Sequence, residues 1–187
     1  MEIGAFRKTA HGVDDRFLNR WSPRAMSGEA IEKETLLGLF EAARWAPSSN
    51  NNQPWRFLYA RRDTKLWPLF FDLLAEGNRI WAIRAAVLIV IISKTTFDFN
   101  DKPSRTHSFD AGAAWENLAL QGALRGLVVH AMQGFDYDQA KETLRIPGWV
   151  SGRGYGRPRE TGPKRGASGE PPGTGVPFRT ERPCGCD

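Results

Sequence analysis

Cysteine is nearly absent from this sequence, and long apolar runs are missing as well. Both cysteines, Cys184 and Cys186, lie at the end of the 187-residue chain, so the body before them cannot form an internal disulfide. This usage fits a reducing, cytoplasmic location. The longest apolar run, 85–92, is far too short to span a membrane, and residues 1–10 lack the apolar run of a signal peptide. We therefore expect no membrane association.

The two common glycine-rich phosphate loops, G-x-G-x-x-G and the Walker motif, are also missing, which excludes the usual nucleotide cradles. The three histidines have no metal-ligand spacing, and a lone C-x-C pair cannot supply the four ligands of a structural zinc. We therefore predict no metal site, and we expect His130 to be packed within the fold.

Residues 148–187 differ in composition from the rest of the chain. They contain 10 of the 19 glycines and 6 of the 12 prolines. Seven basic and four acidic residues give this segment +3 of the net charge of +5 and leave +2 for the body. The segment has too few apolar residues to bury the surface that would offset the entropy lost on ordering it. We therefore expect a disordered tail. The positive charge is mainly a property of this tail, and nucleic acid is not expected as a partner of the body.

The body alternates between helical and extended patterns. Apolar residues at 36, 39, 40 and 43 follow the spacing of one helix face, and the run at 86–92 is typical of a strand covered by helices on both faces. Such alternation predicts the α/β (α+β) class with a mixed sheet flanked by helices. The expected helices are 33–45, 64–76, 110–125 (capped by Asp110 and ended by Gly126) and 136–144 (capped by Asp136), and the expected strands are 56–61, 86–92 and 127–133.

Three stretches carry residues suited to binding a ligand. The first, 20–24, places two arginines around a serine, and planar guanidinium groups bind phosphate through paired donors. The second, 46–55, is a run of small uncharged polar residues that suits a sugar-alcohol chain and the edge of a heterocycle. The third, 130–136, contains Gly134, which allows a close approach of backbone to ligand. Taken singly, each stretch also has a simpler interpretation: the first as a solvated basic segment, the second as a solvated loop and the third as a plain turn. For the second stretch, Trp55 favours a loop anchored on the core.

In this order the stretches resemble the nitroreductase family of FMN-dependent oxidoreductases. The resemblance covers about 15–147, which we expect to be the FMN-binding domain, followed by an irregular tail at 148–187. The motifs that carry it are R-x-S-x-R at 20–24, A-A-R-W-A-P-S-S at 42–49, N-x-Q-P-W-R-F at 51–57, N-R-I-W-A at 78–82, F-D-A-G-A-A at 109–114, N-L-A-L-Q at 117–121 and G-F-D at 134–136.

The resemblance implies a homodimer with FMN at the interface between its subunits. The FMN phosphate and ring edge would be held by Arg20, Ser22 and Arg24. Asn78 would contact the ring, and the backbone of Gln133 and Gly134 would lie near the flavin N5. The residues expected to reach the flavin of the other subunit are Pro47, Ser48, Ser49, Asn51 and Gln53.

The resemblance also implies an activity. NAD(P)H would reduce the flavin and leave before a small electron-poor acceptor, such as a nitroaromatic or a quinone, takes its place in a ping-pong sequence. Because the hydride chemistry belongs to the flavin, no side chain is predicted to be an obligatory acid or base. The alternative is a non-catalytic flavin-binding protein or an inactive remnant with a broken C-terminus.

The family pattern stops at Pro147. Members of the family normally continue into another sheet strand and an arm that wraps the partner subunit, whereas 148–187 shows neither pattern. An out-of-frame reading of a GC-rich gene is one hypothesis, and a genuine flexible tail or a basic nucleic-acid-binding tail are the others. Loss of the strand would leave unpaired edges, so we predict reduced stability and weak FMN retention.

Overall fold

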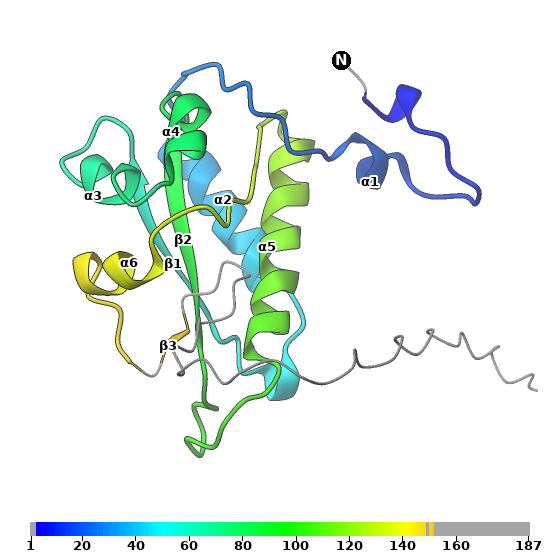
Figure 1. The fold of residues 1–187 in the computed structure, drawn as a ribbon. Helices are drawn as coiled ribbons and strands as arrows, with labels where there is room; N and C mark the ends of the chain where they lie inside the picture. The colour runs from blue at the N-terminus through cyan, green and yellow to red at the C-terminus, as the bar shows by residue number, and fades with distance from the viewer. Residues whose placement is uncertain (1–2, 149, 152–187) are drawn as a thin grey trace, which may run out of the picture. The chain divides into compact units, whose positions relative to one another are not determined.

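The computed structural model describes residues 3–148 and 150–151 (Figure 1). Apart from Gly148 and the short strand β3, the predicted tail lies outside the described residues. Across the described part of the chain, no helix is both long and apolar enough to cross a membrane. In chain order the elements are η1 (Ile3–Phe6), α1 (Asp15–Asn19), α2 (Lys33–Arg44), η2 (Ser49–Asn51), β1 (Trp55–Arg61), α3 (Trp67–Phe71), α4 (Glu76–Ala82), β2 (Val87–Lys94), α5 (His107–Leu124), α6 (Tyr137–Thr143) and β3 (Val150–Ser151).

The strands form one sheet in the order β1-β2-β3. β1 and β2 pair antiparallel along their length, from Trp55 opposite Ser93 to Arg61 opposite Val87. β3 adds a short antiparallel pairing at the end of β2, just beyond the boundary expected at 147. Helices and strands together confirm the α+β class. All strand pairs of 3–148 and 150–151 are antiparallel, so the parallel pairing of a mixed sheet is not formed within them.

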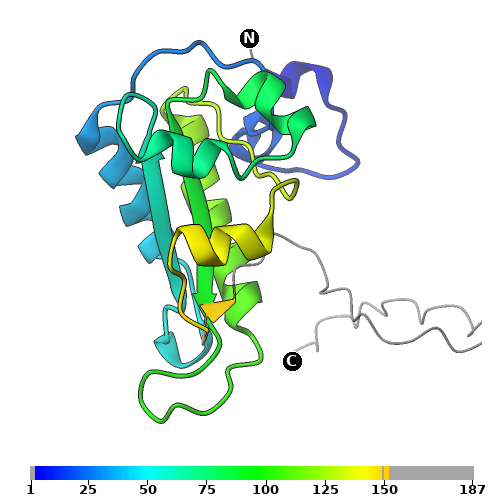
Figure 2. The same cartoon turned by 60° about the vertical axis from the view of Figure 1, so that its left-hand side comes forward.

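Helices cover both faces of the sheet, as the apolar run of β2 predicts (Figure 2). Alternate side chains of a strand point to opposite faces. Ile89 and Ile91 accordingly pack in the cluster formed with α2 and α5, which contains Leu39, Ala114 and Leu118. The side chains on the other face belong to a second cluster with α3 and α4, which includes Leu58, Ala60, Phe70, Ala82, Leu88 and Val90.

Several elements follow the sequence prediction closely. α2, β1 and β2 lie within one or two residues of their expected bounds. Asp136 caps α6 by accepting hydrogen bonds from the backbone N–H groups of Asp138 and Gln139. Gly126 ends α5 with a φ of +73°, and the N–H of Leu127 donates to the carbonyl of Gly122 at 2.9 Å. This is the Schellman pattern, in which a left-handed glycine closes the last helical turn.

The single helix predicted for 64–76 is wrong. α3 spans only Trp67–Phe71, with a proline in its first turn, and α4 begins at Glu76. To continue α3, the N–H of Ala75 would have to donate to the carbonyl of Phe71. It donates instead to the carbonyl of Gly134 at 2.9 Å, within a bridge between Leu74 and Phe135. A tertiary contact therefore replaces the helical hydrogen bond.

Two other predictions need correction. α5 begins at His107 with Thr106 at its N-cap, so Asp110 lies inside the first turn and does not cap the helix. Residues 127–133 form no strand, because no described strand lies beside them to pair with their backbone. Their apolar side chains are held by packing instead: Val129 lies against the α2–α5 cluster and Met132 against the α3–α4 cluster.

Candidate functional site

The polar loop between α2 and β1 has an unusual backbone. Asn50, Asn51 and Gln53 have φ values of +53°, +51° and +46°. Asparagine tolerates this left-handed region, whereas glutamine rarely adopts it, so surrounding contacts must hold the loop. Within the loop, the N–H of Gln53 donates to Ser48 Oγ at 2.9 Å, and the Gln53 side chain donates to Asn51 Oδ1 at 3.1 Å.

Two polar residues that were not predicted to belong to the site anchor this loop. Asn52 is 8% exposed; its amide donates to the carbonyl of Thr96 at 3.4 Å and accepts from the N–H of Asp98 at 2.9 Å. Asp110 is 4% exposed and accepts from the N–H of Ser49 at 3.2 Å. The loop is therefore built against the start of α5. The buried Trp55 beside it confirms the expected anchoring on the core.

The arginine stretch 20–24 follows α1. Arg20 donates to Ser22 Oγ at 3.3 Å and lies 3.5 Å from the Glu116 carboxylate of α5. The Arg24 guanidinium lies 6.0 Å from the centre of the Trp81 ring, a cation–π arrangement. No carboxylate of the described residues pairs with Arg24, so its donors are available to an anion.

Trp81 and His130 attach the arginine stretch to the rest of the fold. Their rings lie 4.5 Å apart, and His130 Nδ1 lies 3.0 Å from the carbonyl of Pro23, which requires that nitrogen to carry the proton. His130 is thus packed, as expected. Trp81 Nε1 is buried without a hydrogen-bond partner among the described residues. The sequence offers no signal that would pair this tryptophan of α4 with Arg24.

Asn78 and Gly134 form the tightest contact of the third stretch. Asn78 Nδ2 donates to the carbonyl of Gly134 at 2.9 Å. A Cβ on residue 134 would lie 2.6 Å from that nitrogen, closer than such atoms can approach. Since Gly134 is not among the residues with positive φ, the close approach itself explains the glycine. Gln133 precedes it and is exposed.

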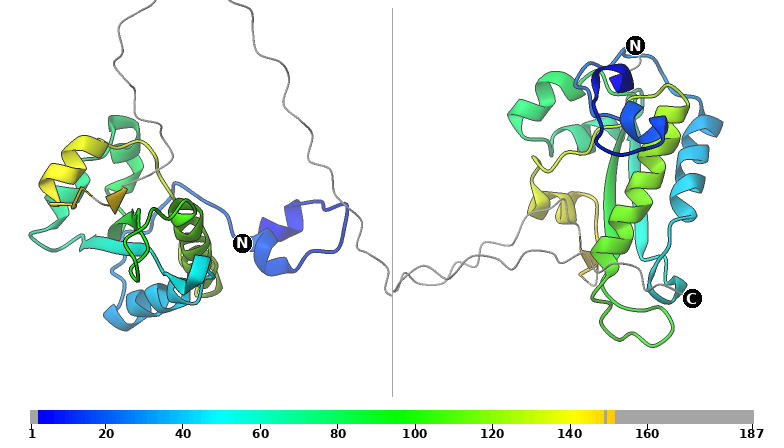
Figure 3. Two further views of the ribbon diagram at one scale, coloured as in Figure 1. Left: turned by 90° about the horizontal axis from the view of Figure 1, so that it is seen from below. Right: turned by 90° about the vertical axis from the view of Figure 1, so that its right-hand side faces the viewer.

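The structure brings some predicted stretches together and separates others (Figure 3). Arg24 and Gly134 meet the same helix, α4, through Trp81 and Asn78. The polar loop lies beside the first turn of α5, whereas residues 20–24 pass near the C-terminal end of that helix (Figures 1 and 3). One chain therefore does not bring all three stretches into contact.

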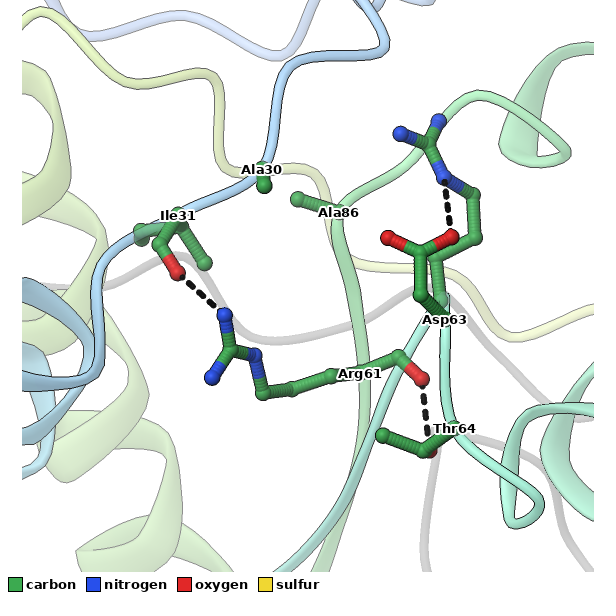
Figure 4. Close-up of a pocket in the computed structure, with 7 residues that line it drawn as sticks. Ala30, Ile31, Arg61, Asp63, Thr64 and Ala86 are labelled. Atoms are coloured by element: carbon green, nitrogen blue, oxygen red, sulfur yellow. Dashed lines mark hydrogen bonds and ion pairs between the residues drawn. The ribbon is translucent and has the colours of Figure 1, made fainter.

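A cavity of about 260 Å³ lies away from these residues, at the end of β1 (Figure 4). Arg61 crosses it and donates to the carbonyl of Ile31 at 3.0 Å, and the Thr64 hydroxyl donates to the Arg61 carbonyl at 2.7 Å. None of the predicted site residues lines it. The cavity is therefore separate from the candidate site.

Two other contacts of titratable side chains stabilise the fold and do not belong to the candidate site. His107 Nδ1 lies 2.8 Å from Ser93 Oγ, but Ser93 is 3% exposed and cannot reach a substrate. The hydrogen bond from the Lys94 ammonium holds the pKa of Asp98 below its usual range. No group of three or more histidine, cysteine or acidic residues in the described part could hold a metal ion.

Known proteins resemble this chain in both sequence and fold. The model of the nitroreductase family matches residues 18–82. A solved structure described as an oxidoreductase containing FMN is 50% identical, with a TM-score of 0.74 over 77% of this chain and 74% of that chain. A nitroreductase from Desulfovibrio desulfuricans, provisionally named as such and solved in complex with FMN, is 26% identical, with a TM-score of 0.55 over 70% of this chain and 72% of that chain.

Curated relatives match shorter or more divergent stretches. A Streptomyces coelicolor protein, provisionally named NADH dehydrogenase/NAD(P)H nitroreductase, is 41% identical over 64 residues, which are 33% of this chain and 30% of that protein. A Rhodopseudomonas palustris protein with the same provisional name is 28% identical over 145 residues, 67% of this chain and 72% of that protein. The matched part thus spans less than a third of the first relative's length.

Proposed function

Because the chain belongs to the nitroreductase family, we propose that it is an FMN-dependent oxidoreductase. We propose further that it uses NAD(P)H to reduce a small electron-poor acceptor, such as a nitroaromatic or a quinone, in a ping-pong sequence. FMN is named for two of the similar solved structures, and NAD(P)H appears in the provisional names of the curated relatives. The expected cytoplasmic location remains a prediction.

The observation that carries this proposal is the set of available donors. Arg24 has no carboxylate partner among the described residues, the loop around Ser48 offers uncharged donors and acceptors, and the N–H of Gly134 has no hydrogen-bond partner among those residues. These are the groups that a phosphate, a polyhydroxy chain and a flat ring edge require. The described residues therefore fit FMN.

Each stretch has a role under this proposal. Arg20, Ser22 and Arg24 would hold the phosphate and ring edge, Asn78 would contact the ring, and the backbone of Gln133 and Gly134 would lie near the flavin N5. Pro47, Ser48, Ser49, Asn51 and Gln53 would face a flavin bound by the partner subunit. When bound, FMN would supply hydride transfer, while the protein orients reactants and excludes water. Preorganised donors near the ring would stabilise negative charge on it without reorganisation.

A homodimer is the proposed assembly. Phe109 is 76% exposed at the start of α5, Leu124 is 60% exposed at its end, and Ile80 is 77% exposed on α4. Large apolar side chains left exposed to solvent are typical of surfaces that another chain covers. A second copy could also place its polar loop against the arginine stretch, which a single chain does not do. These observations support an interface between two copies.

The test uses the full purified chain. We expect flavin absorption bands after purification or after FMN addition, a dimeric mass on a sizing column, and NAD(P)H consumption that depends on a nitroaromatic or quinone. Arg24→Gln should weaken binding of FMN much more than binding of riboflavin, which lacks the phosphate. If neither flavin binds to the wild-type chain, the proposed function is refuted.

One observation favours the alternative of a flavin-binding protein or remnant without turnover. The backbone N–H and C=O groups of residues 128–132 make no hydrogen bond with any described residue. Such unpaired groups destabilise a fold unless water or another strand pairs with them. Flavin binding without NAD(P)H consumption would support the binding protein. Weak FMN retention and low stability, without turnover, would support the remnant.

A further inference from the structure

The carbonyl of Gly134 and the carbonyl of the preceding residue, Gln133, each accept two hydrogen bonds. The Gln133 carbonyl accepts from the N–H of Phe135 at 3.0 Å and from the Tyr137 hydroxyl at 2.8 Å. The Gly134 carbonyl accepts from the N–H of Ala75 and from Asn78 Nδ2, both at 2.9 Å. In the described part of 127–134, only these two carbonyls accept hydrogen bonds.

The N–H of Gly134 has no hydrogen-bond partner among the described residues. It belongs to the same peptide plane as the Gln133 carbonyl, and in a trans peptide the C=O and N–H bonds point in opposite directions. Whatever holds the Gln133 carbonyl therefore also sets the direction of this N–H. Gly134 as a residue is only partly buried.

Tyr137 is well placed to hold that carbonyl. Asp136 caps α6 and makes Tyr137 its first residue, while the Tyr137 ring packs against Phe135 with centres 4.1 Å apart. The ring thus has little freedom, and its hydroxyl is fixed on Gln133. Burial raises the pKa of the Tyr137 phenol above its ordinary value, so the hydroxyl keeps the proton that it donates.

We infer that Tyr137 is a positioning residue that aims the Gly134 N–H at the flavin ring. The Tyr137 hydroxyl orients the peptide plane from one side, and Asn78 fixes the next carbonyl from the other. The donor is thereby set in direction before the ligand arrives, so little ordering remains for binding. This inference rests on the proposed function, since it assumes that a flavin ring lies against Gly134.

The experiment compares the full chain with Tyr137→Phe, which removes only the hydroxyl. Tyr59→Phe is the matched control, because Tyr59 lies on β1, away from 133–137, and packs against Phe40. Riboflavin and FMN are the probes, and their dissociation constants are measured by fluorescence. The ¹⁵N and ¹H shifts of the Gly134 amide are followed by NMR without and with flavin, and thermal unfolding is recorded for each variant.

Tyr137→Phe should weaken binding of both flavins about fivefold, the effect of one hydrogen bond of about 1 kcal/mol. It should also move the Gly134 amide resonance before flavin is added and reduce the further shift that flavin causes. Tyr59→Phe should leave all three readouts unchanged.

Unchanged riboflavin affinity and an unchanged Gly134 shift in Tyr137→Phe would overturn the inference while leaving the proposed function intact. A lower melting temperature with wild-type affinity would overturn it too, since the hydroxyl would then serve stability alone. If wild-type protein binds neither flavin, the proposed function fails, and this role for Tyr137 fails with it.

Discussion

Replacing Gly134 with alanine tests whether a neighbouring side chain or the neighbouring backbone leaves no room for a Cβ at this position. The new Cβ would lie 2.6 Å from Asn78 Nδ2 but 3.5 Å from Ala75 Cβ, an ordinary contact. Only the end of the Asn78 side chain is in the way, and it can rotate aside. The expected loss is therefore its hydrogen bond to the Gly134 carbonyl, about 1 kcal/mol.

A smaller gain in stability, from the unfolded chain, opposes this loss. Alanine restricts the unfolded chain, which stabilises a protein by about 0.4–1 kcal/mol where the native φ suits it. Gly134 is not among the residues with positive φ, and its carbonyl keeps a second donor in Ala75. Gly134→Ala should therefore destabilise the protein by less than about 1 kcal/mol, and yet weaken flavin binding because Asn78 has moved.

The assay is a double-mutant cycle in urea. In an Asn78→Ala background no amide remains to be displaced, so Gly134→Ala should become neutral or stabilising, with a coupling of about 1 kcal/mol. Gly77→Ala is the matched control: it lies in α4, no atom lies within 4 Å of its Cβ, and it should stabilise the helix by up to about 1 kcal/mol. A loss of more than about 3 kcal/mol for Gly134→Ala, or an equal loss in both backgrounds, would refute the reasoning, because backbone would then be the obstacle.

Three further outcomes are expected. Gly122→Ala would place a Cβ 2.5 Å from Val129 Cγ2, and since a β-branched side chain cannot rotate aside easily, urea unfolding should show a loss of about 1–3 kcal/mol that Val129→Ala relieves. Phe109→Arg should lower the dimer fraction on a sizing column with no change in circular dichroism, and an unchanged fraction would place the interface elsewhere. Because Lys94 lowers the folded pKa of Asp98, the stability from that pair is present above the ordinary pKa of 3.8 and lost as pH falls below it. The melting-temperature deficit of Asp98→Asn at neutral pH should accordingly vanish in strong acid, and a deficit that persists there would contradict the assignment.

Local patterns were sufficient wherever a few neighbouring residues set the structure. The apolar face of α2, the aliphatic run of β2, the Asp136 cap and the glycine at 126 each act through contacts within a few residues. Their bounds could therefore be predicted from the sequence, as could the order of motifs that identifies the family. The residue types of the candidate site were visible for the same reason.

Long-range contacts explain what the sequence left undecided. The carbonyl of Gly134 takes the N–H of Ala75 and divides the helix expected at 64–76, while residues 127–133 lack a neighbouring strand and so remain irregular. Asp110 resembles a helix cap in sequence, but Thr106 is the N-cap of α5 and Asp110 holds the polar loop.

The sequence by itself determined the family, the class of fold and which residue types could meet a flavin, because these depend on motif order and side-chain chemistry. Only the tertiary structure decided how those residues are held. Trp81 lies under Arg24, and Asn78 fixes the carbonyl of Gly134. Neither arrangement follows from local pattern, since each depends on where the chain turns back against α4 and on which donors remain unpaired once it has done so.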